Sequence, residues 1–335
     1  MKPLSIGDPL RIGPYRLLGV LGEGGMGKVY LGQDSLSGCA AVKVLRTEMS
    51  HDQNLAQRFV REAWTAQSVT SPGVARVLDA QTEDGRPWIA SEFLVGPTLD
   101  EAITLHGPLD DMMVRALAAD LARALGDIHA AGLVHRDVKP ANIMMTSDGP
   151  RVIDFGIARP EHGLTLTTTG EIPVTPGYGA PEQVLGQRVG PAADVFSLGA
   201  VLVYAATGQR AFGGGHIAAV QYEVVHGQPQ LQQVPEMLRA LIAPCLAKEA
   251  GQRPNPAQIA AAFAPARRTG NIWRQGHLGA MIDRHHAEVR RMVPTAAVSA
   301  SHPGRARRRF LTTLAFGGAA LTVGGGTAAW QFKDD

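Results

Sequence analysis

Residues 135 to 142 read HRDVKPAN, which places Arg136, Asp137 and Lys139 side by side and follows them with Asn142. An exposed turn can carry the same composition, so the segment alone does not reveal a function. It stands after an alanine-rich stretch and before an apolar run that ends in DFG at residues 154–156. The rest of the chain therefore decides which chemistry Asp137 serves.

The composition is that of a globular protein. The chain has 335 residues, of which 45% are hydrophobic and 19% charged, enough for one large domain or two lobes. The net charge of +2 provides no global attraction to nucleic acid. Cys39 and Cys245 are too far apart in the sequence to indicate a disulfide framework, which fits a reducing compartment. The stretch MKPLSIGDPL lacks an apolar core, so we expect no secretory signal.

Predicted strands dominate the first part of the chain and predicted helices the second. Residues 54–69 have helical spacing, and they lie among segments that favour strands, at 15–21, 28–33, 40–45, 74–80 and 88–93. Alanine-rich segments at 111–131 and 192–207 predict long helices, and residues 143–153 predict a hairpin that turns at Asp148 and Gly149. A small β-rich lobe should thus precede a larger helical lobe.

The glycines Gly22, Gly24 and Gly27 of GEGGMG match G-x-G-x-x-G, a pattern common to several nucleotide sites. A P-loop needs Ser or Thr where Val29 stands. A Rossmann turn should open a helix, whereas KVYLGQ favours a strand, although Glu48 lies near the spacing of a ribose-binding acid. The remaining interpretations are an ordinary hairpin turn and a hairpin whose backbone covers phosphates, with Val29 against adenine.

A candidate phosphate-binding cation follows on the next predicted strand. Lys43 lies sixteen residues after Gly27, between Val42 and Val44. A lysine in an apolar strand is costly to bury unless it is paired, and Glu62 on the following predicted helix is its best candidate partner. Each residue alone could be an ordinary surface charge, but together with the glycine segment they indicate a phosphate site.

HRDVKPAN then acquires a role in phosphoryl transfer, in which a protein mainly positions groups and neutralises charge. Asp137 can accept the proton of an attacking hydroxyl, and Lys139 can lie near the γ-phosphate. The predicted hairpin would fold Asp154 back beside Asn142. The two residues would then offer oxygen ligands to a hard cation such as Mg²⁺.

From about residue 15 to residue 263 the sequence resembles Hanks-type protein kinases, specifically the membrane-anchored bacterial serine/threonine kinases. The motifs that carry the resemblance are GEGGMGKV, AVK, the glutamate of REA, HRDVKPAN, DFG, APE at 180–182, DVFSLG at 194–199, and Arg253 in QRP. The resemblance implies an α+β, two-lobed protein kinase fold. A β-rich N-lobe at 15–94 and a helical C-lobe at 95–264 would follow an N-terminal extension at 1–14.

The resemblance also implies a cofactor and a set of site residues. The phosphoryl donor would be ATP with Mg²⁺, which Mn²⁺ can replace, and the acceptors would be Ser or Thr of protein substrates. The implied catalytic residues are Asp137, Lys139, Lys43 and Glu62, and the implied metal ligands are Asn142 and Asp154. The implied nucleotide-binding residues are Leu21, Gly22, Gly24, Gly27, Val29, Ala41, Lys43, Glu92, Leu94 and Met144. The implied structural residues are Arg136, Glu182, Asp194 and Arg253, and the implied autophosphorylation sites are Thr167 and Thr169.

Two positions depart from the family pattern. Ser91 replaces the bulky residue common before the hinge glutamate, which should enlarge the pocket behind adenine, and Val174 stands where a glycine usually precedes Thr175. Lys139 and Thr175 resemble the serine/threonine class. The alternatives are a small-molecule phosphotransferase, which the segment 157–179 and the APE motif disfavour, a pseudokinase, and a non-catalytic membrane scaffold.

The C-terminal part differs from the rest in charge. The stretch between residues 264 and 310 contains ten arginines and only two acidic residues, which gives it a local charge of +8. Residues 265–309 are therefore interpreted as a basic juxtamembrane linker. Residues 310–330 carry no charge and predict a single transmembrane helix, with 331–335 outside and the kinase domain cytoplasmic at the plasma membrane. Glycines and threonines dilute its apolarity, so a flexible or peripheral tail is the alternative. RRRFL also resembles a twin-arginine signal.

A homodimer through the kinase domain is a further expectation, and no nucleic-acid partner is expected.

Overall fold

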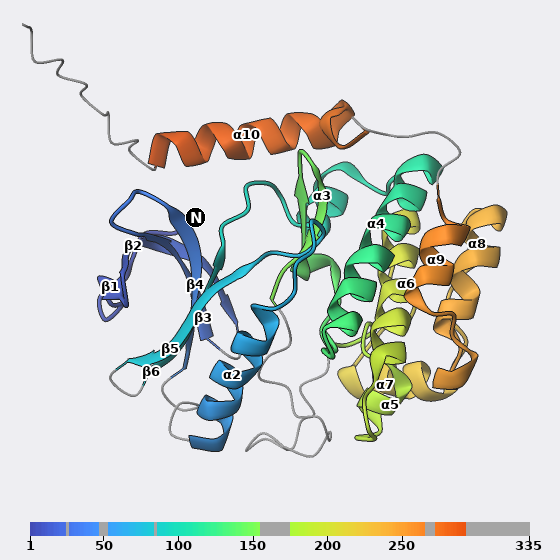
Figure 1. Ribbon diagram of the computed structural model, residues 1–335. Helices are drawn as coiled ribbons and strands as arrows, with labels where there is room; N and C mark the ends of the chain where they lie inside the picture. The colour runs from blue at the N-terminus through green and yellow to red at the C-terminus, as the bar shows by residue number, and fades with distance from the viewer. Residues whose placement is uncertain (25–26, 47–52, 84–85, 155–174, 265–271, 293–335) are drawn as a thin grey trace, which may run out of the picture. The chain divides into compact units, whose positions relative to one another are not determined.

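The computed structural model describes residues 1–24, 27–46, 53–83, 86–154, 175–264 and 272–292 (Figure 1). The predicted activation-loop sites and the segment 310–330 lie outside these ranges. Among the described residues no helix combines the length and apolarity that a membrane crossing requires.

The first lobe is built on an antiparallel sheet of six strands in the order β1-β2-β3-β4-β6-β5 (Figure 1). Its register pairs Lys43 with both Val29 and Ile89, and Ala41 with Ser91. Because directly paired residues share one face of a sheet, this register gathers the pocket residues on one surface. The strands are β1 (Arg11–Ile12), β2 (Tyr15–Gly24), β3 (Gly27–Gln33), β4 (Cys39–Leu45), β5 (Val77–Glu83) and β6 (Arg86–Glu92).

The end of the glycine segment requires a residue without a side chain. Gly27 begins β3 opposite Leu45, and a Cβ atom at Gly27 would lie 2.0 Å from the carbonyl oxygen of Val44. Any larger residue would force β3 and β4 apart, so Gly27 sets how closely the two strands pack.

Helix α2 (Gln53–Ala66) packs against the sheet through Phe59 and Ala63, which are almost fully buried. The indole nitrogen of Trp64 donates a 2.9 Å hydrogen bond to the carbonyl oxygen of Ala80 on β5. This helix carries Glu62, and the predicted helix at 54–69 is thereby confirmed.

The second lobe is helical. Helix α6 has twelve of its seventeen residues buried, and most of the buried residues are apolar, as expected for a helix surrounded by the core. The helices are α3 (Leu99–His106), α4 (Asp111–Ala130), α5 (Pro181–Val184), α6 (Pro191–Thr207), α7 (Ile217–His226), α8 (Glu236–Ile242) and α9 (Pro256–Ala262). The predicted helices at 111–131 and 192–207 correspond to α4 and α6.

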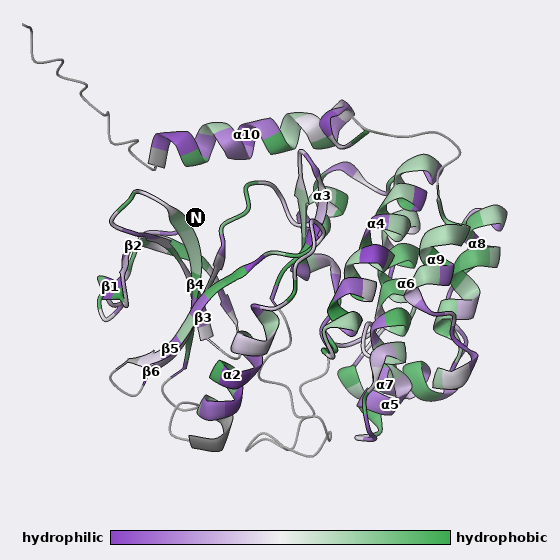
Figure 2. Cartoon of the chain, viewed as in Figure 1, coloured by the Kyte–Doolittle hydropathy of each residue, from purple (hydrophilic) through white to green (hydrophobic). Residues whose placement is uncertain are grey.

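A helix lies inside the range interpreted as a basic linker. After the short turn η4 (Ile272–Arg274), helix α10 (Gly276–Met292) follows, and its residues Leu278, Met281 and Ile282 are buried in the main core (Figure 1). Figure 2 shows hydrophilic residues along much of α10. The buried apolar residues form only a narrow stripe among many charged residues. The sequence pattern therefore did not predict this helix.

Candidate active site

The HRDVKPAN segment leads into the hairpin formed by β7 (Ile143–Thr146) and β8 (Gly149–Val152). Ile143 pairs with Val152, and the amide of Ile153 donates to the carbonyl oxygen of Asn142 at 2.9 Å. The hairpin therefore returns the chain to Asn142, as the sequence predicted, and Asp154 follows directly.

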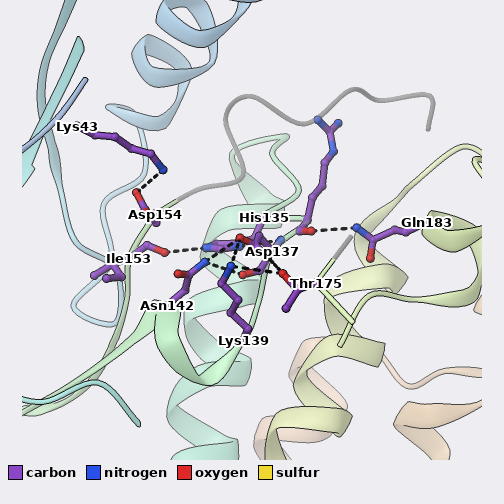
Figure 3. Close-up of polar contacts among 10 residues, drawn as sticks. Lys43, His135, Asp137, Lys139, Asn142, Ile153, Asp154, Thr175 and Gln183 are labelled. Atoms are coloured by element: carbon purple, nitrogen blue, oxygen red, sulfur yellow. Dashed lines mark hydrogen bonds and ion pairs between the residues drawn. The ribbon is translucent and has the colours of Figure 1, made fainter. Parts of the chain in front are cut away.

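Asp137 is the centre of a polar cluster (Figure 3). One carboxylate oxygen accepts a 2.8 Å hydrogen bond from the hydroxyl of Thr175. The other lies 2.9 Å from the ammonium of Lys139 and accepts a 3.1 Å bond from the side-chain amide of Asn142. These bonds hold the carboxylate in one orientation.

Asp194, fully buried on α6, holds the segment that carries Asp137. Its carboxylate accepts 2.8 Å hydrogen bonds from the backbone amides of His135 and Arg136, and it lies 2.8 Å from Nε2 of His129. Arg136 has a φ of 64°, a left-handed conformation that costs a non-glycine residue free energy. The structural role predicted for Asp194 is visible here, since its two bonds stabilise this strained backbone.

A second buried carboxylate fixes the APE segment. Glu182 accepts two hydrogen bonds, at 2.7 and 2.8 Å, from the guanidinium of Arg253. Next to it, the side-chain amide of Gln183 donates to the carbonyl oxygen of Arg136 at 2.9 Å. The predicted pairing of Glu182 with Arg253 is therefore present, and Gln183, which the sequence did not single out, ties the same segment to the HRDVKPAN backbone.

A cavity of about 370 Å³ lies beside this cluster, within the size range of small-molecule sites. Predicted nucleotide residues line it together with Asn142 and Asp154. Gly24 and Gly27, also predicted, shape the adjacent strands and are not part of its lining. The predicted residues in the lining are Leu21, Gly22, Val29, Ala41, Lys43, Glu92, Leu94 and Met144.

Ser91 also lines the cavity, and its hydroxyl lies 3.4 Å from the carbonyl oxygen of Ala41. Ser91 is therefore part of the cavity wall, and the enlargement of the pocket behind adenine stays a prediction.

The expected partner of Lys43 was Glu62, and the structure differs on this point. The ammonium of Lys43 forms a 2.9 Å ion pair with Asp154 (Figure 3), while the carboxylate of Glu62 lies 3.7 Å from the guanidinium of Arg136. Asp154 has a φ of 55°, and its carboxylate lies against Lys43 on β4. Glu62 instead faces the segment that carries Asp137, so the sequence identified the charged groups and not their pairing.

The donor set suits a divalent cation. Asn142 uses its amide nitrogen to bond Asp137, at 2.9 Å to the carbonyl and 3.1 Å to the carboxylate, and this leaves its amide oxygen as an acceptor. Asp154 has a carboxylate that is 38% exposed in the same cavity. One amide oxygen and one carboxylate, with room for water and phosphate oxygens, fit Mg²⁺.

Comparison with known proteins agrees with this geometry. The family described as protein kinase domain matches residues 15–262. The chain belongs to this protein kinase family. Family members use ATP and a divalent metal ion, generally Mg²⁺, which fits the cavity and the donor set of this kinase domain.

The relatives are bacterial serine/threonine protein kinases. The chain is 41% identical over 306 residues to the probable serine/threonine-protein kinase PkwA of Thermomonospora curvata, covering 91% of this chain and 40% of the relative. It is 45% identical over 259 residues to the kinase AfsK of Streptomyces coelicolor, covering 77% and 32%. It is 37% identical over 252 residues to the kinase PknB of Mycolicibacterium smegmatis, covering 71% and 40%. The chain thus spans 32 to 40% of the length of these relatives.

Proposed function

We propose that the chain transfers the γ-phosphoryl group of ATP to serine and threonine hydroxyls of protein substrates. The observation that carries this proposal is the 2.8 Å hydrogen bond from the Thr175 hydroxyl to Asp137. A general base must accept such a bond from the hydroxyl that attacks, and here Asp137 already accepts one from a threonine. The same hydroxyl lies 3.4 Å from Lys139, a cation that can neutralise a phosphoryl oxygen nearby.

The roles of the other residues follow from their positions. Mg²⁺ held by Asn142 and Asp154 would neutralise phosphate charge. Lys43 reaches the same cavity and can bind phosphate oxygens once its bond to Asp154 is exchanged. Asp194 keeps the Asp137 segment in its strained conformation, so little reorganisation is needed when a substrate binds.

The test is phosphoryl transfer from radiolabelled ATP by the purified chain to matched peptides whose acceptor is serine, threonine or tyrosine. Transfer to serine and threonine is expected in the unchanged protein and near-background transfer in Asp137→Asn. Asp127→Asn, which changes an exposed aspartate on α4, is the matched control and should keep full activity. Equal transfer by Asp137→Asn would contradict the role of the base, and preferential tyrosine transfer would contradict the substrate class.

Autophosphorylation at Thr167 and Thr169 is a further part of the proposal. It is supported by their place between DFG and APE in the sequence and by Arg136, a cation suited to hold a phosphate. Mass spectrometry of the active protein should find phosphate on these threonines, and phosphate absent from Thr165, Thr167, Thr168 and Thr169 would contradict it.

Attachment to the plasma membrane through residues 310–330, with the kinase domain in the cytoplasm, is supported by the uncharged run and by the arginines before it. The full chain should remain with membranes after carbonate extraction, whereas residues 1–304 should not. Quantitative recovery of the full chain in the soluble fraction would overturn the anchor.

A homodimer through the kinase domain is also proposed, and it should give twice the monomer mass in light scattering. Mn²⁺ should support phosphoryl transfer in place of Mg²⁺.

A further inference from the structure

The nucleotide cavity has a wall that the matched family region, residues 15–262, does not include. Three residues of α10, His285, Glu288 and Val289, line the cavity together with the predicted nucleotide residues. Figure 1 shows α10 running from α3 in the helical lobe toward the strands of the first lobe. The helix therefore adds side chains to a site that the other motifs already form.

Helix α10 is firmly anchored at its start. Ile272 and Trp273, just before it, are each 6% exposed. The guanidinium of Arg274 lies 2.8 Å from the carboxylate of Asp148 and donates a 3.1 Å bond to the carbonyl oxygen of Ser147, both in the β7–β8 turn. Since this hairpin also positions Asn142 and Asp154, the helix and the metal ligands share one support.

The buried face of α10 continues directly into the cavity. Met281 and Ile282 are 4% and 2% exposed, and the cavity residues His285 and Glu288 follow at helical spacing on the same side. Nδ1 of His285 lies 3.1 Å from the carbonyl oxygen of Met281, which fixes the imidazole against the helix. The position of Glu288 is thus set by a packed helix rather than by a loose tail.

Four carboxylates line the cavity, and three of them have partners. Asp154 pairs with Lys43, Glu92 with Arg151 at 2.9 Å, and Glu101 accepts a 2.9 Å bond from the amide of Thr98 as part of a helix cap. Within the part of the chain that the structure describes, Glu288 takes part in no ion pair or hydrogen bond. It is the lining carboxylate that remains available to a ligand.

The chemistry of a nucleotide limits what Glu288 can bind. An ionised carboxylate only accepts hydrogen bonds and repels phosphate oxygens, so the phosphates of ATP are excluded as its partner. Lys43, Asn142 and Asp154 mark the phosphate end, and the strand end at Glu92 to Leu94 is the predicted adenine side. The ribose of a nucleotide bound in this orientation would lie between these ends, and it offers two neighbouring hydroxyl donors, which suit the two oxygens of one carboxylate.

We propose that Glu288 accepts hydrogen bonds from the ribose hydroxyls of the bound nucleotide, so that α10 selects ribonucleotides over deoxyribonucleotides. The proposal rests on the proposed function in that it takes the cavity to be the ATP site. A site built to bond a hydroxyl rejects an analogue that lacks it, because the polar group of the protein is then left unpaired.

Binding of ADP and of 2′-deoxy-ADP to the full chain, followed by calorimetry, tests this without relying on catalysis. The unchanged protein should bind ADP at least about tenfold more tightly than 2′-deoxy-ADP, the ratio expected for one bond to a charged group. Glu288→Ala should lose most of the ADP affinity advantage and bind 2′-deoxy-ADP as before, with Glu288→Gln in between. Asp283→Ala, an exposed acid on the same helix outside the cavity lining, is the matched control and should keep the preference.

The outcomes separate the inference from the proposed function. An unaltered preference for ADP in Glu288→Ala would overturn the inference alone, as would tighter binding of both nucleotides, which would make α10 a barrier. Failure of the unchanged protein to bind ADP would overturn the assignment of the ATP site and this inference with it. Glu288 is exposed, so its replacement should leave the melting temperature of the protein nearly unchanged.

Discussion

Two ion pairs of nearly equal length are built very differently. Arg253 in the helical lobe bonds both oxygens of Glu182, at 2.7 and 2.8 Å, and its side chain is 0% exposed. It also donates to the backbone carbonyls of Ala192, Ala247 and Lys248. Lys43 in the nucleotide cavity meets one oxygen of Asp154 at 2.9 Å, and the two side chains are 21% and 38% exposed.

The two pairs serve different purposes, because one is buried and the other is partly exposed. Separating a buried pair leaves charges without compensation, so the bond of Arg253 to Glu182 persists. A partly exposed single contact is worth little free energy, so Asp154 can leave Lys43 for another ligand at small cost. The first pair should therefore matter to folding and the second to phosphoryl transfer.

The largest effect on stability is expected for Arg253→Met. Removing the guanidinium leaves Glu182 buried without a cation, which should lower the free energy of unfolding by about 3–5 kcal/mol in urea titrations. Arg188→Met, at an exposed position, is the matched control and should change it by less than about 0.5 kcal/mol. The double variant Glu182→Gln with Arg253→Met should recover part of the loss. A loss below about 1 kcal/mol in Arg253→Met would show that the buried pair contributes no more than an exposed ion pair.

Asp154→Asn should lower the rate of phosphoryl transfer strongly and change the stability of the protein little. The transfer rate should fall by about 10²–10³-fold, the scale of losing one preorganised charge-stabilising group. The free energy of unfolding should change by no more than about 1 kcal/mol, since the pair with Lys43 is partly exposed. An unchanged rate would remove Asp154 from the metal site, and destabilisation as large as that of Arg253→Met would erase the distinction between the pairs.

A smaller effect, confined to the cavity, is expected for Ser91→Met. The longer side chain should fill the space behind adenine and weaken inhibitors that extend there by about tenfold, as one clash or lost pocket contact does. Inhibition constants for an extended and an unextended compound of the same series measure this, and the unextended compound should bind both proteins alike. Equal inhibition by the extended compound would show that Ser91 does not set the pocket size.

The smallest effect concerns Lys248, whose backbone carbonyl binds Arg253. Burial, with repulsion from Arg253, lowers the pKa of Lys248 from 10.5 to about 8, against the opposing influence of Glu223. Between pH 8 and 10.5 the unfolded chain then binds more protons at this group, so its contribution to stability should rise with pH across that window. The unfolding free energy of the wild type should therefore rise between pH 8 and pH 10 relative to that of Lys248→Met. A difference that is flat with pH would contradict the lowered pKa.

Local patterns predicted much of the fold and most of the site. Period-two strands, alanine-rich helices and the turn at Gly149 were recognisable because their spacing follows directly from backbone geometry. The ion-pair partner of Lys43 could not be predicted, because it depends on the direction in which α2 presents Glu62. That direction is set by packing between segments that are distant in the sequence. Helix α10 was missed because its apolar stripe of Leu278, Met281 and Ile282 is narrow among many charges. Gln183 ties the APE segment to the carbonyl oxygen of Arg136, and no sequence motif predicts this contact.

The exchange of Asp154 from Lys43 to a metal ion is tested most directly by thermal unfolding with a non-hydrolysable ATP analogue, with and without Mg²⁺. A ligand that binds the folded state raises the melting temperature. In wild type, and in the control Asp283→Asn, adding Mg²⁺ to the nucleotide should raise the melting temperature further. In Asp154→Asn the nucleotide alone should still stabilise the protein, and Mg²⁺ should add nothing. An equal Mg²⁺-dependent rise in Asp154→Asn would contradict the account, because the cation would then be held without the carboxylate assigned to it.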